Sequence, residues 1–403
     1  MSAKKKSAKK KTSGCGWTLL LLIGFGTWLW PRMKYVDYVD VEQFSFDKAG
    51  KIASDILQGE QAATPVVDYS PSIAQVPTTI PTTEVAAVPV VQDSGNSVPM
   101  AWPTLPATWA NKEMRGIYLS RYMATNRASE QMIRDRVRYY KAQGINTIIH
   151  GVWGNGCTMY KSEVMMQTLG YSSCPNQFQD EWLDWLVDEA HQQGMQVHAY
   201  FEKGIKLDEN SPIFDLAVQK KWFVPGIDRT YAGVDHYLLD VEKPEVAKYF
   251  HEIQAEFVRK YPKIDAVQWD DYLGYHEELS GGVDRTRELT RFAKGLRNAV
   301  KQTNPEVSFD VCHHNPYWGK RYFDADWKNW DVDRAFIQVY NDNNFDEEMA
   351  YVSQVEGIAV SDAQFGRLGA IANDPRVKSV FLFPSNGNPE ETAARFKQAA
   401  GVK

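Results

Sequence analysis

The chain has 403 residues, 43% of them hydrophobic, which is enough apolar material for one large core and excludes a protein that is disordered throughout. The formal net charge of −6 already includes six lysines between positions 4 and 11, so the rest of the chain is more acidic than this total suggests. We therefore expect no nucleic-acid partner for the body of the protein.

The first predicted segments are a basic tail, residues 1–15, and an apolar run, residues 16–30. A membrane-spanning helix needs about 20 apolar residues, so this run is at the short end of the range. We expect a retained signal anchor, because no small-residue cleavage site directly follows it; a cleaved signal peptide and a soluble basic tail are the alternatives. The positive residues would remain in the cytoplasm. The chain is thus expected to be a single-pass protein of the cytoplasmic (inner) membrane, with everything after the anchor periplasmic or extracellular.

A linker is predicted over residues 31–110. A partly helical piece, about 41–58, precedes a stretch from 61 to 110 that contains eight prolines among Thr, Val and Ala. Such a composition cannot nucleate a core, and it is typical of a disordered, extended tether.

Residues 111–403 show a regular alternation of short apolar runs with segments of helical period, such as the face formed by Ile133, Val137 and Tyr140. Eight strands are predicted, at 115–120, 146–152, 196–201, 264–270, 307–313, 335–340, 357–361 and 379–383. Eight strand–helix repeats indicate the α/β class and a (β/α)8 TIM barrel. A short extra run at 237–240 leaves the strand count open by one.

The cysteines carry information if this domain is exported, because an oxidising compartment permits disulfides. Cys157 and Cys174 bracket the polar segment 158–173, which has the composition of a long loop, so we expect a bridge between them. Cys312 lies in a predicted strand and is expected to be a buried thiol. No metal-ligand spacing is present, so we expect neither a metal nor another cofactor.

Catalytic residues of a barrel lie at the carboxyl ends of its strands. Side chains alternate along a strand, which turns Gln268 and Asp270 toward the lumen and Trp269 toward the helices. The same argument turns Glu202 of the third strand inward. Two neighbouring strands thus each bring a carboxylate to the mouth of the barrel.

Paired carboxylates suit the cleavage of a glycosidic bond. One must stay ionised beside the positive charge of the transition state, while the other, kept protonated, donates to the leaving oxygen. We assign Asp270 as nucleophile or charge stabiliser and Glu202 as acid/base. Asp271 is expected to point the opposite way and to support a loop, and Asp310 of the fifth strand is a further candidate. Retaining and inverting mechanisms remain open.

Other side chains near the predicted mouth are candidates for binding sugar by stacking or hydrogen bonding. Trp153 and Tyr160, in the segment after the second strand, are the best-placed aromatic residues. Arg121 is expected to pair either with a substrate carboxylate or with a neighbouring acidic side chain. The remaining candidates are His198, Tyr200, Gln268, Tyr272, Gln338, Tyr340 and Asn341.

Two alternatives belong to other classes. A metal-dependent barrel hydrolase would draw on His150, His198, His313 and His314, but the first strand has no His-x-His and no carboxylate stands at ligand spacing. A non-catalytic glycan-binding module would keep the barrel and the aromatic residues without turnover.

Several segments, in order over residues 114–386, together resemble the glycosyl hydrolase-like 10 family. They include Met114 to Leu119, Met159 to Ser162, Val197 to Tyr200, Ile264 to Tyr272 and Gln338 to Tyr340. The resemblance implies an extracytoplasmic (β/α)8 glycosidase domain. It also implies a polysaccharide substrate, with peptidoglycan strands that lack stem peptides as the first candidate; protein partners are not indicated.

Overall fold

A computed structural model describes residues 103–403, except 122–124, 126, 176–177, 230–233, 278, 280–281 and 386. The expected basic tail, the anchor and the linker up to residue 102 lie outside these residues. In the described part of the chain, no helix is both long and apolar enough to cross a membrane.

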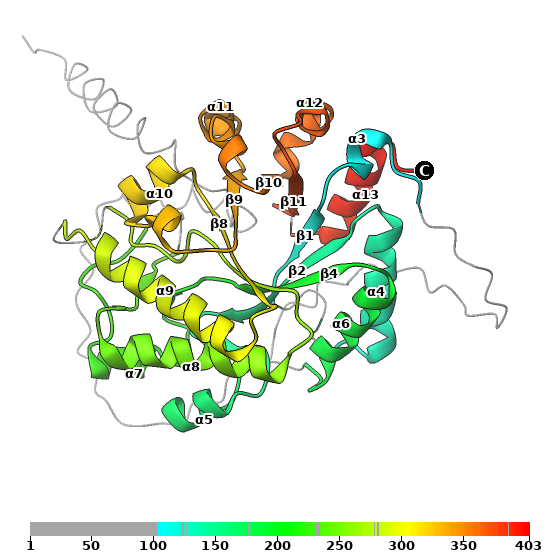
Figure 1. Ribbon diagram of the computed structural model, residues 1–403. Helices are drawn as coiled ribbons and strands as arrows, with labels where there is room; N and C mark the ends of the chain where they lie inside the picture. Colours follow the sequence, from blue (N-terminus) through cyan, green and yellow to red (C-terminus); the bar gives the residue numbers. More distant parts are fainter. Residues whose placement is uncertain are drawn as a thin grey trace, which may run out of the picture. The chain divides into compact units, whose positions relative to one another are not determined.

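Eight parallel strands form a closed barrel with helices around it (Figure 1). The strand order is β1-β11-β10-β9-β8-β7-β4-β2, and pairing of β1 with β2 closes the ring. The predicted α/β class and eight-stranded barrel are confirmed, and each predicted run contains or closely overlaps one strand. The strands are β1 (Arg115–Leu119), β2 (Thr147–Gly154), β4 (Gln196–Phe201), β7 (Ala266–Trp269), β8 (Ser308–His313), β9 (Arg334–Val339), β10 (Gly357–Ser361) and β11 (Ser379–Phe383).

Helices connect successive strands and cover the outside of the barrel with apolar faces; the long helices α4, α6, α8 and α9 are prominent in Figure 1. The helices are α3 (Ala107–Ala110), α4 (Glu130–Ala142), α5 (Glu163–Leu169), α6 (Trp182–Gln192), α7 (Phe214–Lys220), α8 (Pro244–Lys260), α9 (Thr286–Thr303), α10 (Pro316–Phe323), α11 (Phe345–Met349), α12 (Leu368–Asn373) and α13 (Pro389–Ala400). Short 3-10 turns are η3 (Trp327–Asn329), η4 (Asp342–Asn344), η5 (Val352–Gln354) and η6 (Asp362–Arg367).

Helix α4 shows how local sequence sets these boundaries. Ser129 accepts a hydrogen bond from the backbone N–H of Met132 and begins the helix. Gly144 follows the last turn with a φ of +92°, a conformation that disfavours any residue with a Cβ. The helix therefore stops just before β2, as the sequence predicts.

The packed domain starts earlier than residue 111. Trp109 in α3 is buried, and its ring meets that of Phe396 in α13 at 4.9 Å. The backbone of Thr104 exchanges hydrogen bonds of 2.9 and 3.1 Å with Lys403. Residues 103–110, expected in the linker, thus pack against the C-terminal helix (Figure 1).

Two small additions decorate the barrel. The extra run near 237 forms β6 (Tyr237–Leu238), which pairs with β5 (Lys206–Leu207) in a separate antiparallel sheet and so does not enter the barrel. The hairpin strand β3 (Cys157–Thr158) pairs with β2, and Cys157 forms a disulfide with Cys174. The segment between these cysteines is not a plain loop, because it contains α5.

Candidate active site

The lumen changes in character from the strand starts to the strand ends. Near the start of β9, Arg334 donates to both oxygens of the Asp310 carboxylate at 2.7–3.0 Å. Above this ion pair lies an apolar and aromatic layer, which includes Tyr118, Tyr200, Cys312, Phe336 and Phe381. Cys312 is a buried thiol, as expected. Beyond this layer, at the carboxyl ends of the strands, acidic and basic side chains lie together again.

Asp270 and Asp271 follow the last residue of β7 and are 4% and 3% exposed. Asp270 accepts a hydrogen bond from the Tyr200 hydroxyl and one of 3.0 Å from the backbone N–H of Tyr272. Asp271 accepts from the Gln338 amide at 2.8 Å. The expectation that Asp271 points away from the lumen is therefore wrong. The strand ends at Trp269, so strict alternation does not extend to Asp271.

The two carboxyl groups have different electrostatic environments. Burial raises the pKa of Asp270 well above its ordinary range, and the negative charge of Asp271 adds to this effect. Burial alone would also raise the pKa of Asp271, but His314, Lys206, His313 and the Gln338 hydrogen bond lower it below its ordinary range. The pair thus favours one protonated carboxyl, on Asp270, and one ionised carboxylate, on Asp271.

Glu202 lies directly after β4, the barrel strand next to β7. Its carboxylate accepts hydrogen bonds from the Ser120 hydroxyl at 2.8 Å and from the backbone N–H of Arg121 at 3.1 Å. The Arg121 guanidinium lies 3.5 Å from the same carboxylate. Of the two partners expected for Arg121, the structure therefore provides the neighbouring acidic side chain.

A glycine brings the loops after β4 and β7 together. Gly204 has a φ of +44°, and a Cβ at this position would lie 2.6 Å from the carbonyl oxygen of Tyr272. The backbone N–H of Ile205 donates to that same oxygen at 3.3 Å. This close approach places the loop that carries Glu202 against the loop that carries Asp270 and Asp271.

Lys206 and Asp228 form an ion pair at the mouth that the sequence did not reveal. The Lys206 ammonium lies 2.8 Å from the Asp228 carboxylate, and both side chains are fully buried. It also lies 4.7 Å from the ring centroid of Tyr272, a favourable cation–π position. The ammonium group contributes positive potential at both Asp270 and Asp271.

His314 and Glu348 form a second unpredicted pair. His314 Nδ1 lies 2.9 Å from one oxygen of the Glu348 carboxylate, and the backbone N–H of Asn315 donates to the other at 2.8 Å. The sequence indicated His314 only as a candidate metal ligand. No sequence pattern marked Glu348 as a site residue, because it lies in the short helix α11, far along the chain, and only the fold brings it to the mouth.

Asp310 and His198 do not lie at the mouth, so neither fits its predicted role. Asp310 is fully buried, bound by Arg334 and by the Ser308 hydroxyl at 2.5 Å. The His198 ring is fully buried beside the same ion pair, with Nδ1 3.8 Å from Asp310. Gln268 is also fully buried, and it accepts a hydrogen bond of 2.8 Å from Tyr118. These three side chains are bonded inside the lumen and are not open to a sugar.

Trp153 and Tyr160 are also misassigned as sugar-binding residues, because both are fully buried on the helix side of the barrel. Trp153 donates to the carbonyl oxygen of Gly204 at 3.0 Å and packs edge-on against Phe250. The Tyr160 ring packs against Phe257 of α8. No face of either ring is open to a ligand.

Tyr272, Gln338 and Tyr200 do lie with the carboxylates, whereas the two residues after β9 lie at the edge. The Tyr340 ring packs on Phe383 at 5.1 Å and is partly buried. Asn341 caps η4, accepting from the backbone N–H of Asn343 at 2.8 Å. The binding role of these five residues stays a prediction.

The four histidines of the metal alternative are not brought together. His150 packs on Trp182 on the outer face of the barrel, and His198 lies deep in the lumen, away from His313 and His314. In the described ranges, no three His, Cys, Asp or Glu side chains are grouped so as to hold a metal ion.

Residues 113–285 match the sequence model of a family described as glycosyl hydrolase-like 10. A protein named Glycosyl hydrolase DigH is 27% identical over 216 residues in Escherichia coli, covering 46% of this chain and 48% of that protein. In Shigella flexneri it is 27% identical over 211 residues, covering 47% and 46%. The chain spans about half the length of the curated relatives it matches.

Solved structures of glycoside hydrolases align with this chain at low sequence identity. A GH20 exo-β-N-acetylglucosaminidase from Vibrio harveyi aligns with a TM-score of 0.49 at 9% identity, covering 73% of this chain and 54% of that one. A GH36 α-galactosidase from Geobacillus stearothermophilus aligns with a TM-score of 0.43 at 17% identity, covering 74% and 42%.

Proposed function

We propose that this protein, which belongs to the glycosyl hydrolase-like 10 family through residues 113–285, is a glycosidase that cleaves an envelope or extracellular polysaccharide. The observation that carries the proposal is the pair of nearly buried carboxyl groups at the end of β7, one hydrogen-bonded to the Tyr200 hydroxyl and the other to the Gln338 amide. The opposite directions of their pKa shifts support it. Glycoside cleavage requires one protonated and one ionised carboxyl group at the same bond.

The directions of the pKa shifts support a division of roles different from the one expected from sequence. Asp270, whose pKa is raised, is the group suited to donate a proton to the leaving oxygen. Asp271, whose pKa is lowered, is suited to stabilise positive charge at the anomeric carbon. Glu202 is the alternative acid or base, because it follows the adjacent strand β4 and its side chain is 18% exposed.

Peptidoglycan glycan strands are the substrate we favour. The family resemblance and the predicted membrane anchor at 16–30 support this choice, because an anchor of this kind would hold the barrel beside the cell wall on the outer side of the cytoplasmic membrane. The barrel would then meet its polysaccharide without a further targeting module.

The purified full-length chain, incubated with intact and peptide-stripped peptidoglycan and with plant and algal glycans, tests the activity through the release of reducing ends. We expect release from peptide-stripped strands by the wild-type chain, and none by Asp270→Asn. The absence of release from every polymer would refute the glycosidase proposal.

A non-catalytic glycan-binding barrel is the second candidate. The low exposure of both Asp270 and Asp271 favours it, because reacting groups must reach the substrate. Pull-down of the same polymers separates the two functions: a binding module retains the glycan without releasing reducing ends, and Asp270→Asn would not alter its behaviour.

A further inference from the structure

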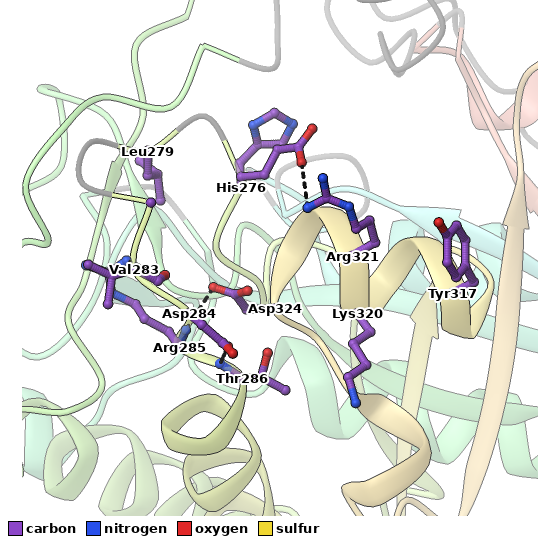
Figure 2. Close-up of a pocket in the computed structure, with 12 residues that line it drawn as sticks. His276, Leu279, Val283, Asp284, Arg285, Thr286, Tyr317, Lys320, Arg321 and Asp324 are labelled. Carbon is purple, nitrogen blue, oxygen red and sulfur yellow. Dashed lines mark hydrogen bonds and ion pairs between the residues drawn. The ribbon is translucent and has the colours of Figure 1, made fainter.

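A cavity of about 510 Å³ lies between helix α10 and described residues that follow β7, namely His276, Glu277, Leu279 and Gly282 to Thr286 (Figure 2). Tyr317, Lys320 and Arg321 project from α10, and Val283, Asp284 and Arg285 lie on the opposite side. The cavity has room for one or two sugar rings, since small-ligand sites span about 300–1,000 Å³. None of these residues belongs to the acidic site described above.

The cavity is lined by equal numbers of acidic and basic side chains: Glu277, Asp284 and Asp324, and Arg285, Lys320 and Arg321. Arg321 pairs with Glu277 at 3.2 Å, and Lys320 pairs with Asp326 at 2.9 Å. Asp324 accepts a hydrogen bond of 3.1 Å from the backbone N–H of Arg285. A site with balanced charges does not concentrate an anion or a cation, so it suits an uncharged ligand that can hydrogen-bond to charged groups.

Exposed apolar surface is concentrated at the same place. Among residues the structure describes, five large hydrophobic side chains are exposed, and two of them, Tyr317 at 61% and Val283 at 51%, line this cavity. Tyr317 is the only aromatic residue of the five. An open aromatic face beside several hydrogen-bonding groups matches the two-sided chemistry of a pyranose ring, which has an apolar face and a rim of hydroxyls.

The cavity wall is continuous with the acidic site. The loop that starts at Asp270 continues to Tyr275 and Glu277, whose backbone N–H groups donate to α10 at Phe323 and Tyr322 at 2.7 and 2.9 Å. The other side of Phe323 stacks on His314 at 5.1 Å. One glycan chain that reaches from the mouth across α10 would therefore meet both places.

We propose that this cavity is a distal subsite that binds an uncharged pyranose unit of the glycan, one or more units away from the bond that Asp270 and Asp271 cleave. The inference rests on the proposed function and deepens it, because a distal subsite makes the enzyme prefer long chains and cut within them. Tyr317 would supply the stacking platform, and the charged side chains would bind the hydroxyl groups.

The test uses the full-length chain with uncharged β-1,4-linked N-acetylglucosamine oligomers, the trimer and the hexamer, with binding measured calorimetrically in an Asp270→Asn background. We expect the hexamer to bind more tightly than the trimer, and Tyr317→Ala to weaken hexamer binding about tenfold. Hexamer affinity should hardly change between low and high salt, since the site and ligand carry no net opposing charge. Met166→Ala, which truncates another large exposed side chain, on α5 and outside this cavity, is the matched control and should leave binding intact.

The outcomes distinguish this inference from the proposed function. The subsite alone would be overturned if protein with the native Asp270 cleaves the hexamer while Tyr317→Ala leaves hexamer affinity unchanged. Hexamer binding that depends on Tyr317 without any cleavage would support the subsite and count against the glycosidase. Failure of both oligomers to bind would overturn the subsite, while release of reducing ends from a polymer would still uphold the glycosidase.

Discussion

Asp270 and Asp271 are adjacent in the chain and both nearly buried, yet the pKa of the first is raised and that of the second is lowered. Burial and the charge of Asp271 raise the pKa of Asp270, although the hydrogen bond from the Tyr200 hydroxyl acts in the opposite direction. For Asp271, the nearby cationic side chains and the hydrogen bond from the Gln338 amide outweigh the effect of burial. This difference is the one that the proposed roles of acid and charge stabiliser require.

Replacement of Asp270 by Asn should reduce the release of reducing ends at least about 100-fold, the usual contribution of a general acid. The same change should raise the melting temperature at neutral pH. Folding raises the pKa of the Asp270 carboxyl, so the free energy of unfolding falls as the pH rises from the unfolded-state pKa to the folded-state pKa. An amide does not ionise, so Asp270→Asn removes this loss at neutral pH. Asp188→Asn, at an exposed ion pair, is the control. Unchanged turnover would contradict the role of Asp270.

The pH profile of kcat/KM should be bell-shaped. Activity should rise with pH as Asp271 ionises, below its ordinary range, and fall as Asp270 loses its proton, above its ordinary range. Since the Lys206 cation helps to lower the pKa of Asp271, the double change Lys206→Met and Asp228→Asn should move the acid limb to higher pH. The double change avoids leaving one buried charge without its partner. An acid limb that does not move would exclude this role of Lys206.

The ion pair of Asp310 and Arg334 should act on stability. Asp310→Ala leaves the guanidinium in the lumen without its carboxylate, which should lower the free energy of unfolding by about 3–5 kcal/mol in urea denaturation. The double change Asp310→Leu and Arg334→Met should recover much of this loss, because it removes both charges. If Asp310→Ala folds with full stability and loses turnover, Asp310 belongs to the active site after all.

Loss of the disulfide should destabilise the segment that carries α5. Cys157 and Cys174 close a loop with a sequence separation of 17, and a loop of this size contributes about 3 kcal/mol in the chain-entropy account. We expect the Cys157→Ser, Cys174→Ser form to melt at a lower temperature than the oxidised protein. Dithiothreitol should lower the melting temperature of wild-type protein and leave that of the double variant unchanged.

The sequence determined the barrel by itself. Strand–helix alternation, the period of the helical faces and stop signals such as Gly144 are local features, and each strand prediction depended on them. The inward direction of Asp270 was also a local consequence, because β7 is a regular strand up to Trp269. The cysteine pair could be found because its two members lie close in sequence.

Only the tertiary structure decided which polar residues meet. Strands of a closed barrel are staggered, so Asp310, the third residue of β8, pairs with Arg334, the first residue of β9, and lies deep in the lumen. Trp153 lies within β2, which continues two residues beyond the predicted strand, and Tyr160 follows the hairpin strand β3; both are buried on the helix side. Asp271 turned inward where the strand ended, and Lys206 and Glu348 came to the mouth on segments with no sequence signal. Alternation and periodicity act over a few residues, whereas the composition of the site depends on contacts between residues far apart in the chain.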